Sequence, residues 1–380
     1  MLLEENKPLA PFTTFAIGGP ARFFCSATSE DEIIEATGWA EERNLPLFVL
    51  GGGSNLLVSD AGFDGLVLRV GLRGITAVHS TQNLNTESRV CQGTTSVVPQ
   101  MPQNENGALA PEGQIIYQVA AGEDWDRFVQ RTVEDNCAGV ECLAGIPGTV
   151  GGTPVQNVGA YGQEVASAIM CVRAFDLHKG LFSEFTASEC DFAYRRSRFN
   201  SADRGRYIVT RVDFRLTPGG APTVRYADLQ RAQAEGRELS LAEVAAVVRR
   251  VRQSKGMLLV EGDPDCRSAG SFFKNPIVTE DQLRSIAALS ALPPPRFPAG
   301  AEAENQGRVK VPAAWLIEQA GFSKGYVLGA AAISSRHTLA LTNRGAASAA
   351  EVLALAAKIT AAVEARFAIR LEMEPVLVGF

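Results

Sequence analysis

The sequence predicts a mixed protein in which helices and largely antiparallel strands surround two glycine-rich segments. Short apolar runs between turn residues are typical of strands, and periodic apolar segments that begin at Ser are typical of capped helices. The third observation is the segment 143–164, LAGIPGTVGGTPVQNVGAYGQE, which holds six glycines and one charged residue, Glu164. Because glycine lets main-chain N–H groups approach a ligand closely, we interpret this segment as a backbone cradle for a phosphate, with a pair of tight turns as the alternative.

The N-terminal part predicts one helix among several short strands. The helix begins behind Ser29, and Glu32 stands where the partner of a capping box belongs. One wholly apolar strand leads directly into Gly51–Asn55, a second glycine-rich run, for which a simple turn between strands is the alternative. The strands are predicted at 13–24 (with a turn at Gly18-Gly19), 45–50, 56–60 and 65–70.

Two segments lack periodicity, and we expect both to be exposed insertions. The segment 77–113 is rich in Ser, Thr, Asn, Gln and Pro, and is expected to be mobile and without a catalytic role. The segment 290–307 contains a proline run. The other predicted elements are a strand, turn and helix over 115–136, antiparallel strands at 169–176, 182–186 and 206–216, a basic cluster at 192–200, helices at 240–257, 311–320 and 347–366, a turn-rich stretch at 268–276, and a final strand within 369–380.

Neither glycine-rich segment matches a standard phosphate-binding motif. A Walker loop needs a Lys after its second glycine, and no Lys lies within 143–164. A Rossmann fingerprint needs G-x-G-x-x-G between a strand and a helix. Gly148–Thr153 lacks this spacing, and Gly51–Asn55 continues into a strand with Leu56 at the third glycine position. Any nucleotide here is expected to be held by another fold.

Composition excludes several classes of function. The net charge of −6 gives no reason to expect nucleic acid or an anionic membrane as a partner. Seven scattered cysteines, an odd number, and an N-terminus without an apolar signal region predict reduced thiols in the cytoplasm. No apolar run is long enough to span a bilayer. The three histidines are too dispersed to suggest a metal site, so no metal is predicted.

Several stretches taken together resemble the UDP-N-acetylenolpyruvoylglucosamine reductase (MurB) family. They occur in the family's order and cover nearly the whole chain apart from the two insertions. GAYGQE and the segment that begins Tyr226-Ala-Asp-Leu are similar to the subgroup with an extra substrate-covering loop. The stretches are TTFAIGG (13–19), LGGGSNLLV (50–58), AGIPGTVGGTPVQNVGAYGQE (144–164), YRRS (194–197), KGM (255–257), AGSFFKNP (269–276), WLIEQAG (315–321) and LEMEPV (371–376).

The resemblance implies an α+β fold with a two-lobed FAD-binding module of the vanillyl-alcohol oxidase type and a smaller α/β substrate-binding domain. The FAD-binding module is expected over 1–218, a substrate loop and linking helix over 219–256, and the C-terminal substrate-binding domain over 257–380. The final strand is expected to return towards the flavin.

The resemblance also implies the cofactor, the reductant and the reaction. FAD, bound non-covalently, would contact both glycine-rich segments, and two anchors suit an extended dinucleotide. The implied reaction reduces the enolpyruvyl ether of a UDP-sugar to a lactyl ether, with hydride passing from NADPH through the flavin, and NADH as the alternative reductant. A monomer is expected. The cofactor-binding residues are Gly51, Gly52, Gly53, Ser54, Asn55, Gly145, Ile146, Pro147, Gly148, Gly151 and Gly152.

Three residues match the family's catalytic positions. Ser271 matches the proton donor, although a serine hydroxyl is a poor acid that needs help from a neighbour. Arg195 matches the arginine that grips the enolpyruvyl carboxylate, because a guanidinium suits a bidentate pair. Glu374 matches the C-terminal glutamate that stabilises the enolate or relays a proton. Glu372 is the competing choice, since both would face the same side of a strand, and Pro375 departs from the family pattern.

Five further residues match positions that contact substrate. They are Tyr161, Tyr226, Lys255, Asn275 and Gln319. Two other functions are weighed against this one. An alcohol oxidase of the same flavoprotein type would not need Arg195, Ser271 and Glu374 together, and a non-catalytic nucleotide-binding protein would not be expected to keep all three.

Overall fold

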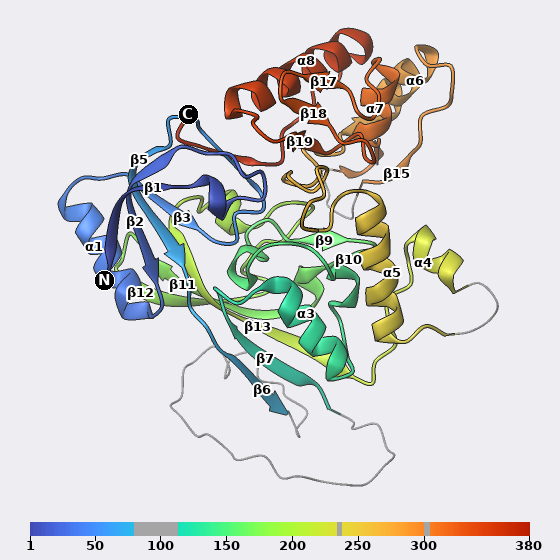
Figure 1. The fold of residues 1–380 in the computed structure, drawn as a ribbon. Helices are drawn as coiled ribbons and strands as arrows, with labels where there is room; N and C mark the ends of the chain where they lie inside the picture. The colour runs from blue at the N-terminus through green and yellow to red at the C-terminus, as the bar shows by residue number, and fades with distance from the viewer. Residues whose placement is uncertain (80–112, 234–237, 300–304) are drawn as a thin grey trace. The chain divides into compact units, whose positions relative to one another are not determined.

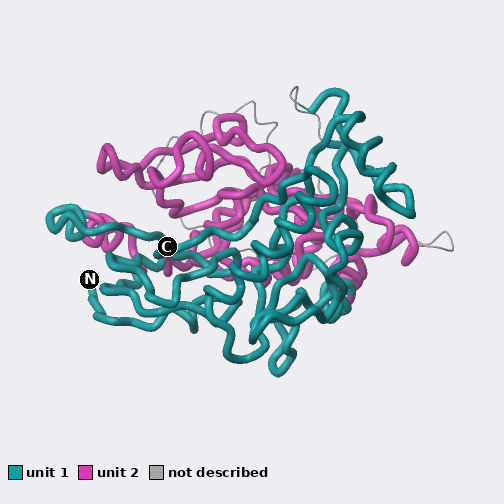
Figure 2. Tube along the Cα trace, turned by 90° about the horizontal axis from the view of Figure 1, so that it is seen from above, with its two compact units in different colours: residues 1–26, 38–69, 251–380 teal, residues 27–37, 70–250 magenta. Residues whose placement is uncertain are grey.

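The structure is a computed structural model, and the chain in it forms two compact units (Figure 2). Unit 1 comprises residues 1–26, 38–69 and 251–380, and unit 2 comprises residues 27–37 and 70–250. Each unit therefore combines segments that are distant in the sequence. The described residues are 1–79, 113–233, 238–299 and 305–380. Most of the predicted insertion 77–113, and residues 300–304 of the second insertion, lie outside them.

Unit 2 contains an antiparallel sheet with the strand order β12-β11-β13-β7-β6, and β8 pairs with the end of β13. Its strands are β6 (Ile75–His79), β7 (Ile115–Ala120), β8 (Cys137–Ala138), β11 (Ile169–Asp176), β12 (Leu181–Thr186) and β13 (Tyr207–Pro218). The prediction of antiparallel strands in this part of the chain is confirmed. The predicted start of the insertion at residue 77 was wrong, because residues up to His79 pair with β7 in a regular ladder.

Helix α3 (Trp125–Glu134) lies beside this sheet (Figure 1), and its aromatic side chains contact Phe214 of the sheet. The ring centroids of Phe128 and Phe214 in β13 are 4.9 Å apart, and those of Trp125 and Phe214 are 5.8 Å apart. Burying each such side chain stabilises the fold by about 1.5–3 kcal/mol. The Trp125 indole N–H also donates to the carbonyl of Leu143 (3.1 Å), which ties the helix to the start of the glycine-rich segment 143–164.

The N-terminal part of unit 1 is a sheet with the strand order β1-β2-β5-β3. A separate parallel pair joins β4 to β20, so the C-terminal strand lies beside the strand that follows Gly51–Asn55. Helix α1 (Glu30–Glu42) follows β2, and Ser29 accepts a hydrogen bond from the N–H of Glu32 (3.2 Å), as its capping role predicts. The strands are β1 (Leu3–Pro8), β2 (Pro20–Ala27), β3 (Leu47–Leu50), β4 (Leu56–Val58), β5 (Phe63–Val70) and β20 (Val376–Val378).

The C-terminal part of unit 1 is organised around helix α8 (Ala349–Phe367), which lies across a small antiparallel sheet (Figure 1). The capping box of Ser348 and Glu351 begins α8, within the helix predicted at 347–366, and such a cap contributes about 1 kcal/mol. One buried core joins α8 to this sheet and reaches Phe272 and Phe273. The other elements here are α6 (Glu280–Ala288), α7 (Ala313–Gln319), β14 (Ile277–Thr279), β15 (Phe297–Pro298), β16 (Arg308–Lys310), β17 (Val327–Leu328), β18 (Ala331–Ile333) and β19 (Leu341–Asn343).

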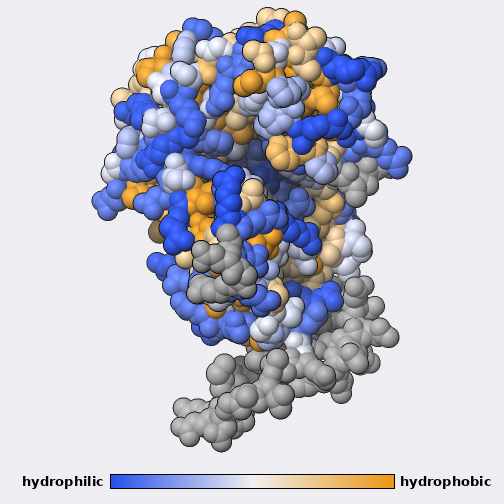
Figure 3. Space-filling view, turned by 90° about the vertical axis from the view of Figure 1, so that its right-hand side faces the viewer, coloured by the Kyte–Doolittle hydropathy of each residue, from blue (hydrophilic) through white to orange (hydrophobic). Residues whose placement is uncertain are grey.

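The remaining elements are short, apart from α5 (Leu241–Ser254), the helix predicted at 240–257. Ser240 and Glu243 exchange reciprocal hydrogen bonds at its start. Among the described residues no helix is both long enough and apolar enough to cross a membrane. Hydrophobic and hydrophilic residues are interspersed on the face shown in Figure 3. The short elements are β9 (Gly159–Ala160), β10 (Gln163–Glu164) and α4 (Ala227–Ala232).

Candidate active site

The loop Gly51–Asn55 connects β3 to β4, and its carbonyl groups are bonded within unit 1. Thr14 donates its N–H to the Gly53 carbonyl (3.1 Å) and its hydroxyl to the Ser54 carbonyl (3.3 Å). In a trans peptide the C=O and the following N–H point in opposite directions. The N–H groups of Ser54 and Asn55 therefore point away from Thr14. Successive N–H groups in a turn suit an anion such as a diphosphate.

Only glycine fits at position 53 of this loop. Gly53 has a φ of +64°, and an added Cβ would lie 1.8 Å from the carbonyl oxygen of Phe12. Both the conformation and the close approach of two backbone segments exclude a side chain. The loop therefore depends on Gly53 for its shape, as the prediction of close backbone approach required.

The second glycine-rich loop, in unit 2, uses several of its glycines for contacts within the protein, and Gly152 itself donates its N–H to the Thr149 carbonyl (3.0 Å). Gly145 donates its N–H to the Asp126 carboxylate (2.6 Å), and Gly151 donates to the Ala121 carbonyl (2.8 Å). A Cβ on Gly151 would lie 2.6 Å from the Cβ of Ala121, whereas a Cβ on Gly152 would meet nothing within 4 Å. Gly152 is also exposed. Gly151 is therefore needed for packing, and Gly152 is a position where a ligand can approach the backbone.

Unit 1 brings Ser271 and Glu374 close to the first glycine loop through main-chain contacts. Glu374 donates its N–H to the carbonyl of Phe272, the residue after Ser271 (2.9 Å). The Asn55 side-chain amide donates to the Glu374 carbonyl (3.2 Å), and the Asn55 carbonyl accepts from the N–H of Val376 (2.9 Å). Residues separated by more than three hundred positions thus form one hydrogen-bonded corner.

Glu372 and Glu374 lie in different surroundings. The Glu372 carboxylate pairs with Lys274 (3.2 Å) and is 75 % exposed, whereas Glu374 is half-buried. The expectation that both belong to the final strand was wrong, because that strand begins only at Val376, and Met373 between them forms an isolated antiparallel bridge with Phe273. Pro375 fits immediately before this strand, where a missing N–H interrupts no ladder.

Arg195, in unit 2, lies at the tip of a tight turn closed by two hydrogen bonds between Ala193 and Arg196 (3.0 and 3.1 Å). Its φ is +56°, a conformation that costs a non-glycine residue roughly 1 kcal/mol or more. The guanidinium donates to the Gly159 carbonyl (3.0 Å), while Arg196 pairs with Asp191 (2.9 Å). The two arginines therefore point to different places from one tight turn.

Tyr161 and Tyr226 contact each other edge to face, with ring centroids 5.1 Å apart and an interplanar angle of 87°. Tyr161 has a φ of +52° and lies in the turn that joins β9 to β10. Since Arg195 contacts Gly159 of the same hairpin, unit 2 gathers three of the predicted site residues around Gly159–Gly162.

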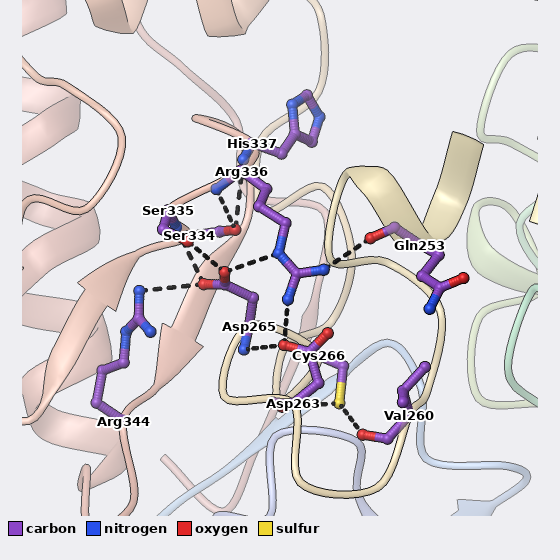
Figure 4. Close-up of polar contacts among 10 residues, drawn as sticks. All are labelled: Gln253, Val260, Asp263, Asp265, Cys266, Ser334, Ser335, Arg336, His337 and Arg344. Atoms are coloured by element: carbon purple, nitrogen blue, oxygen red, sulfur yellow. Dashed lines mark hydrogen bonds and ion pairs between the residues drawn. The ribbon is translucent and has the colours of Figure 1, made fainter. Parts of the chain in front are cut away.

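Lys255 follows α5 directly, and a charged cluster fixes the end of that helix (Figure 4). The Arg336 guanidinium donates to the carbonyl of Gln253 (2.8 Å) and also binds Asp263. A cation at the last carbonyls of a helix is favourable because it meets the negative end of the helix dipole. The position at which Lys255 leaves the helix is therefore well defined.

Asp265 is the centre of this cluster and is 2 % exposed. Its carboxylate pairs with Arg336 (3.2 Å) and Arg344 (3.0 Å), and it accepts two hydrogen bonds from Ser335 (3.0 and 2.5 Å). Burial alone would raise the pKa of Asp265, but the hydrogen bonds from Ser335 and the charge of Arg344 outweigh it and hold the pKa below its usual value.

His337, in the same region, is held neutral at pH 7. Burial is the main cause, and the charges of Lys255 and Lys324 add to it, so that the pKa of His337 falls to about 4. An uncharged imidazole near Lys255 can donate or accept a hydrogen bond without changing the charge of this part of unit 1.

Asn275 and Gln319 lie at the two ends of α7. The Asn275 side-chain carbonyl accepts the N–H of Ala313 at the start of the helix (2.9 Å), so this residue has a structural role beside the predicted one. Gln319 is the last residue of α7 and is half-buried.

Three buried polar residues that support these groups were not predicted from the sequence. Asn157, 1 % exposed, donates to the Ala193 carbonyl of the turn that carries Arg195 (3.1 Å). Asp265 fixes the loop beyond Lys255, and Glu141, 1 % exposed, accepts hydrogen bonds beside the second glycine loop. A signal was present for Glu141, because a charge inside the apolar run of residues 140–144 is expected to be either exposed or bound by several donors.

The candidate site residues are thus divided between the units. Ser271, Glu374, Lys255, Asn275, Gln319 and the loop Gly51–Asn55 belong to unit 1, and Arg195, Tyr161, Tyr226 and the loop Gly145–Gly152 belong to unit 2. The part of the chain that the structure describes holds no group of three or more His, Cys, Asp and Glu side chains that could bind a metal ion.

Comparison with known proteins identifies both parts of the chain. Residues 21–180 match the FAD binding domain family, and residues 263–378 match the family described as UDP-N-acetylenolpyruvoylglucosamine reductase, C-terminal domain. FAD is therefore the cofactor, which agrees with the two glycine loops described above. The α+β class and the combination of an FAD-binding module with a second domain are confirmed.

Similar proteins extend over nearly the whole chain. The UDP-N-acetylenolpyruvoylglucosamine reductase of Streptomyces coelicolor is 44% identical over 99% of this chain and 90% of its own length. That of Thermobifida fusca is 43% identical over 99% of this chain and 98% of its own length. The crystal structure of the Thermus caldophilus reductase (MurB) superposes with a TM-score of 0.62 at 25% identity, covering 99% of this chain and 100% of the other. This chain therefore belongs to the UDP-N-acetylenolpyruvoylglucosamine reductase family.

Proposed function

We propose that this chain reduces UDP-N-acetylglucosamine enolpyruvate to UDP-N-acetylmuramate, with NADPH as the reductant, in the synthesis of peptidoglycan precursors. The observation that carries the proposal is the hydrogen-bonded corner of unit 1, in which the residue after Ser271, Glu374 and Asn55 of a glycine loop contact one another. This corner would join a proton donor and a carboxyl group to a backbone cradle for FAD. When bound, FAD supplies the hydride chemistry, accepting hydride from NADPH and delivering it to the terminal alkene carbon of the substrate.

The side chains of the protein would handle the charge and the proton that this chemistry requires. Negative charge develops on the carbon beside the substrate carboxylate, and Arg195 would bind that carboxylate with its guanidinium. Ser271 would donate the proton to the same carbon. Since Lys274 is paired with Glu372, and Asn275 with the start of α7, Glu374 is the neighbour that we assign to support Ser271.

The remaining site residues would hold the UDP-sugar. Lys255 offers a positive charge to its diphosphate or carboxylate, while Tyr161 and Tyr226 present aromatic faces and hydroxyl groups. Asn275 and Gln319 would add polar contacts. In this assignment residues 1–218 form the FAD-binding module, 219–256 the substrate loop and linking helix, and 257–380 the substrate-binding domain. We infer that the enzyme works as a monomer in the cytoplasm, without nucleic acid or membrane as a partner.

The variant Ser271→Ala tests the proton-donor role. Reduction of bound FAD by NADPH should proceed at the parent rate, because no proton from serine enters that half-reaction. Return of the oxidised flavin absorbance on adding substrate should slow by roughly two to four orders of magnitude, the usual effect of losing a general acid. Stopped-flow absorbance with each half-reaction measured separately is the experiment, and Ser285→Ala on α6 is the control.

Return of the absorbance at the parent rate in Ser271→Ala would leave the serine with a structural role only. Glu374 or a water molecule would then have to supply the proton. A protein that binds no FAD at micromolar concentration would overturn the whole assignment.

A further inference from the structure

Glu141 is a buried carboxylate whose hydrogen-bond donors, in the part of the chain that the structure describes, are neutral. Its side chain accepts hydrogen bonds from the N–H of Gly139 (2.8 Å), the N–H of Thr223 (2.8 Å) and the side-chain amide of Gln163 (3.2 Å). Taking a carboxylate out of water costs several kcal/mol unless such donors replace the water. Because burying this carboxylate costs free energy, we expect Glu141 to hold a specific segment in place. Glu141 has no role in the reaction proposed above.

The segment that Glu141 holds is the one around Thr223, which is fixed at three points. Besides its N–H, the Thr223 carbonyl accepts from the Cys142 thiol (3.1 Å), and its hydroxyl accepts from the Gln163 amide (3.4 Å). Burial, with the Glu141 charge, raises the pKa of Cys142 to about 12, so the thiol keeps its proton and remains a donor. The Gln163 side-chain carbonyl accepts the N–H of Cys142 (2.9 Å), which closes the network.

Each member of this network adjoins a proposed site residue. Glu141 and Cys142 lie just before Gly145 of the second glycine loop, Gln163 lies two positions after Tyr161, and Thr223 lies three positions before Tyr226. The segments that contain Gly162 and Arg225 also approach each other closely, because a Cβ on Gly162 would lie 3.0 Å from the Cβ of Arg225. One carboxylate therefore stands where the glycine loop, the Tyr161 turn and the Tyr226 segment meet within unit 2.

We propose that Glu141 is a positioning residue that holds Tyr226 in its edge-to-face contact with Tyr161, and so sets the affinity for the UDP-sugar. It touches neither flavin nor substrate and acts through Thr223. The inference rests on the proposed function in one respect only, namely that Tyr226 contacts substrate. The anchoring of the Tyr226 segment by Glu141 stands on the hydrogen bonds alone.

The isosteric variant Glu141→Gln is the sharpest probe of this role. An amide of the same shape can accept from only one of the two main-chain N–H groups, and its NH2 then faces the other donor. The network should therefore open at Thr223 or Gly139 while the packing of the side chain is kept. Gln163→Met, which also keeps the shape and removes the three hydrogen bonds of the Gln163 side chain, is a second variant that does not place an unpaired group against Gly139.

The first experiment follows hydrogen exchange of the FAD-bound protein in peptides covering residues 219–233. Both variants should exchange at least tenfold faster there and at the parent rate in β11 and β13. Gln130→Met, on the exposed face of α3, is the control and should change neither. Unchanged exchange at 219–233 in Glu141→Gln, with parent-like FAD binding and thermal stability, would overturn the inference whatever the enzyme's substrate is.

The second experiment is a double-mutant cycle on the KM for UDP-N-acetylglucosamine enolpyruvate. Glu141→Gln alone should raise KM at least tenfold and leave the rate of flavin reduction by NADPH unchanged. In a Tyr226→Ala background it should add less than twofold, because the ring that it positions is already absent. Additive effects of the two substitutions would refute action through Tyr226. If Tyr226→Ala itself leaves KM unchanged while exchange at 219–233 rises in Glu141→Gln, the anchoring stands and the proposed substrate role of Tyr226 fails.

Discussion

Arg195 and Tyr161, two of the proposed site residues, are held in a strained backbone conformation. Both have φ values in the left-handed region, +56° and +52°, where glycine would be at ease. Arg195 occupies a position in a four-residue turn that would suit glycine. The residue there nevertheless carries a long charged side chain. Strain of this kind persists where the surrounding contacts over-determine it. Here those contacts are the bond from Asn157 to Ala193 and the bond from Arg195 to Gly159.

Replacing Arg195 separates this strain from its function. Arg195→Gly and Arg195→Ala both remove the guanidinium, so each should lower kcat/KM for substrate reduction roughly 10- to 150-fold, the equivalent of about 1.5–3 kcal/mol for a charged hydrogen-bonded group. Only glycine relieves the backbone, so Arg195→Gly should be more stable than Arg195→Ala by about 1 kcal/mol. Urea unfolding measures the difference in stability, and steady-state kinetics measure kcat/KM. Equal stability of the two variants would show that the turn is not strained.

At the level of elements, the two glycine loops are held in different ways. The first is shaped by the close approach of Phe12 and Thr14, and the second packs through Gly151 against Ala121. Gly152, one residue on, faces open space and has no restriction from φ. The second loop therefore offers a matched pair of neighbouring glycines, one needed for packing and one with open space where a side chain would lie.

Alanine at position 151 should mainly lower stability, whereas alanine at position 152 should mainly weaken FAD binding. Gly151→Ala places a methyl group 2.6 Å from the Ala121 side chain, so we expect destabilisation by about 1–3 kcal/mol, typical of overpacking. Gly152→Ala should leave the stability of the FAD-free protein within about 0.5 kcal/mol and weaken FAD binding at least tenfold, because the methyl group occupies the backbone surface that the flavin approaches. Thermal melts and fluorescence titration with FAD measure the two effects. Parent-like FAD affinity in Gly152→Ala would remove this glycine from the cofactor site.

Helices and strands that depend on residues close together in the sequence could be predicted from it. The caps at Ser29, Ser240 and Ser348 mark real helix starts, because the partner of each cap lies three residues away. The final strand predicted within 369–380 is confined to Val376–Val378, and before it only an isolated antiparallel bridge joins Met373 to Phe273 in the described part of the chain. A sequence pattern records alternation, and it does not record which partner strand is present or where pairing begins.

At the scale of the whole molecule, the resemblance supplied the set of candidate site residues, and the structure supplied what holds them. Asp265, Asn157 and Glu141 could not be identified as supports from the sequence, because their partners lie far along the chain. Asp265 binds Arg336 and Arg344, some seventy residues away, and Glu141 binds Thr223 after more than eighty. Pairing over such distances depends on the folded topology, which no local pattern encodes.

Acid stability of the whole protein should reflect one buried ion pair of unit 2. The Asp176 carboxylate is fully buried and accepts two hydrogen bonds from Arg206 (2.7 and 3.1 Å), and these are the main reason that the pKa of Asp176 falls from 3.8 to about 2. A folded-state pKa below the unfolded value means that the stabilisation is present above about pH 4 and is lost as the pH falls towards 2.

Asp176→Asn should therefore be less stable than the parent at pH 7 and should lose less of its stability between pH 4 and pH 2. The amide cannot titrate, and half-buried Arg206 can reach water once the carboxylate is gone. Urea unfolding at intervals across this range measures the slope for each protein. Asp64→Asn is the control, because Asp64 is 86% exposed in its pair with Arg22 and such pairs contribute little. If Asp176→Asn and the parent lose stability in parallel as the pH falls, the acid sensitivity arises elsewhere in the chain, and buried Asp265 with its lowered pKa is the next residue to test.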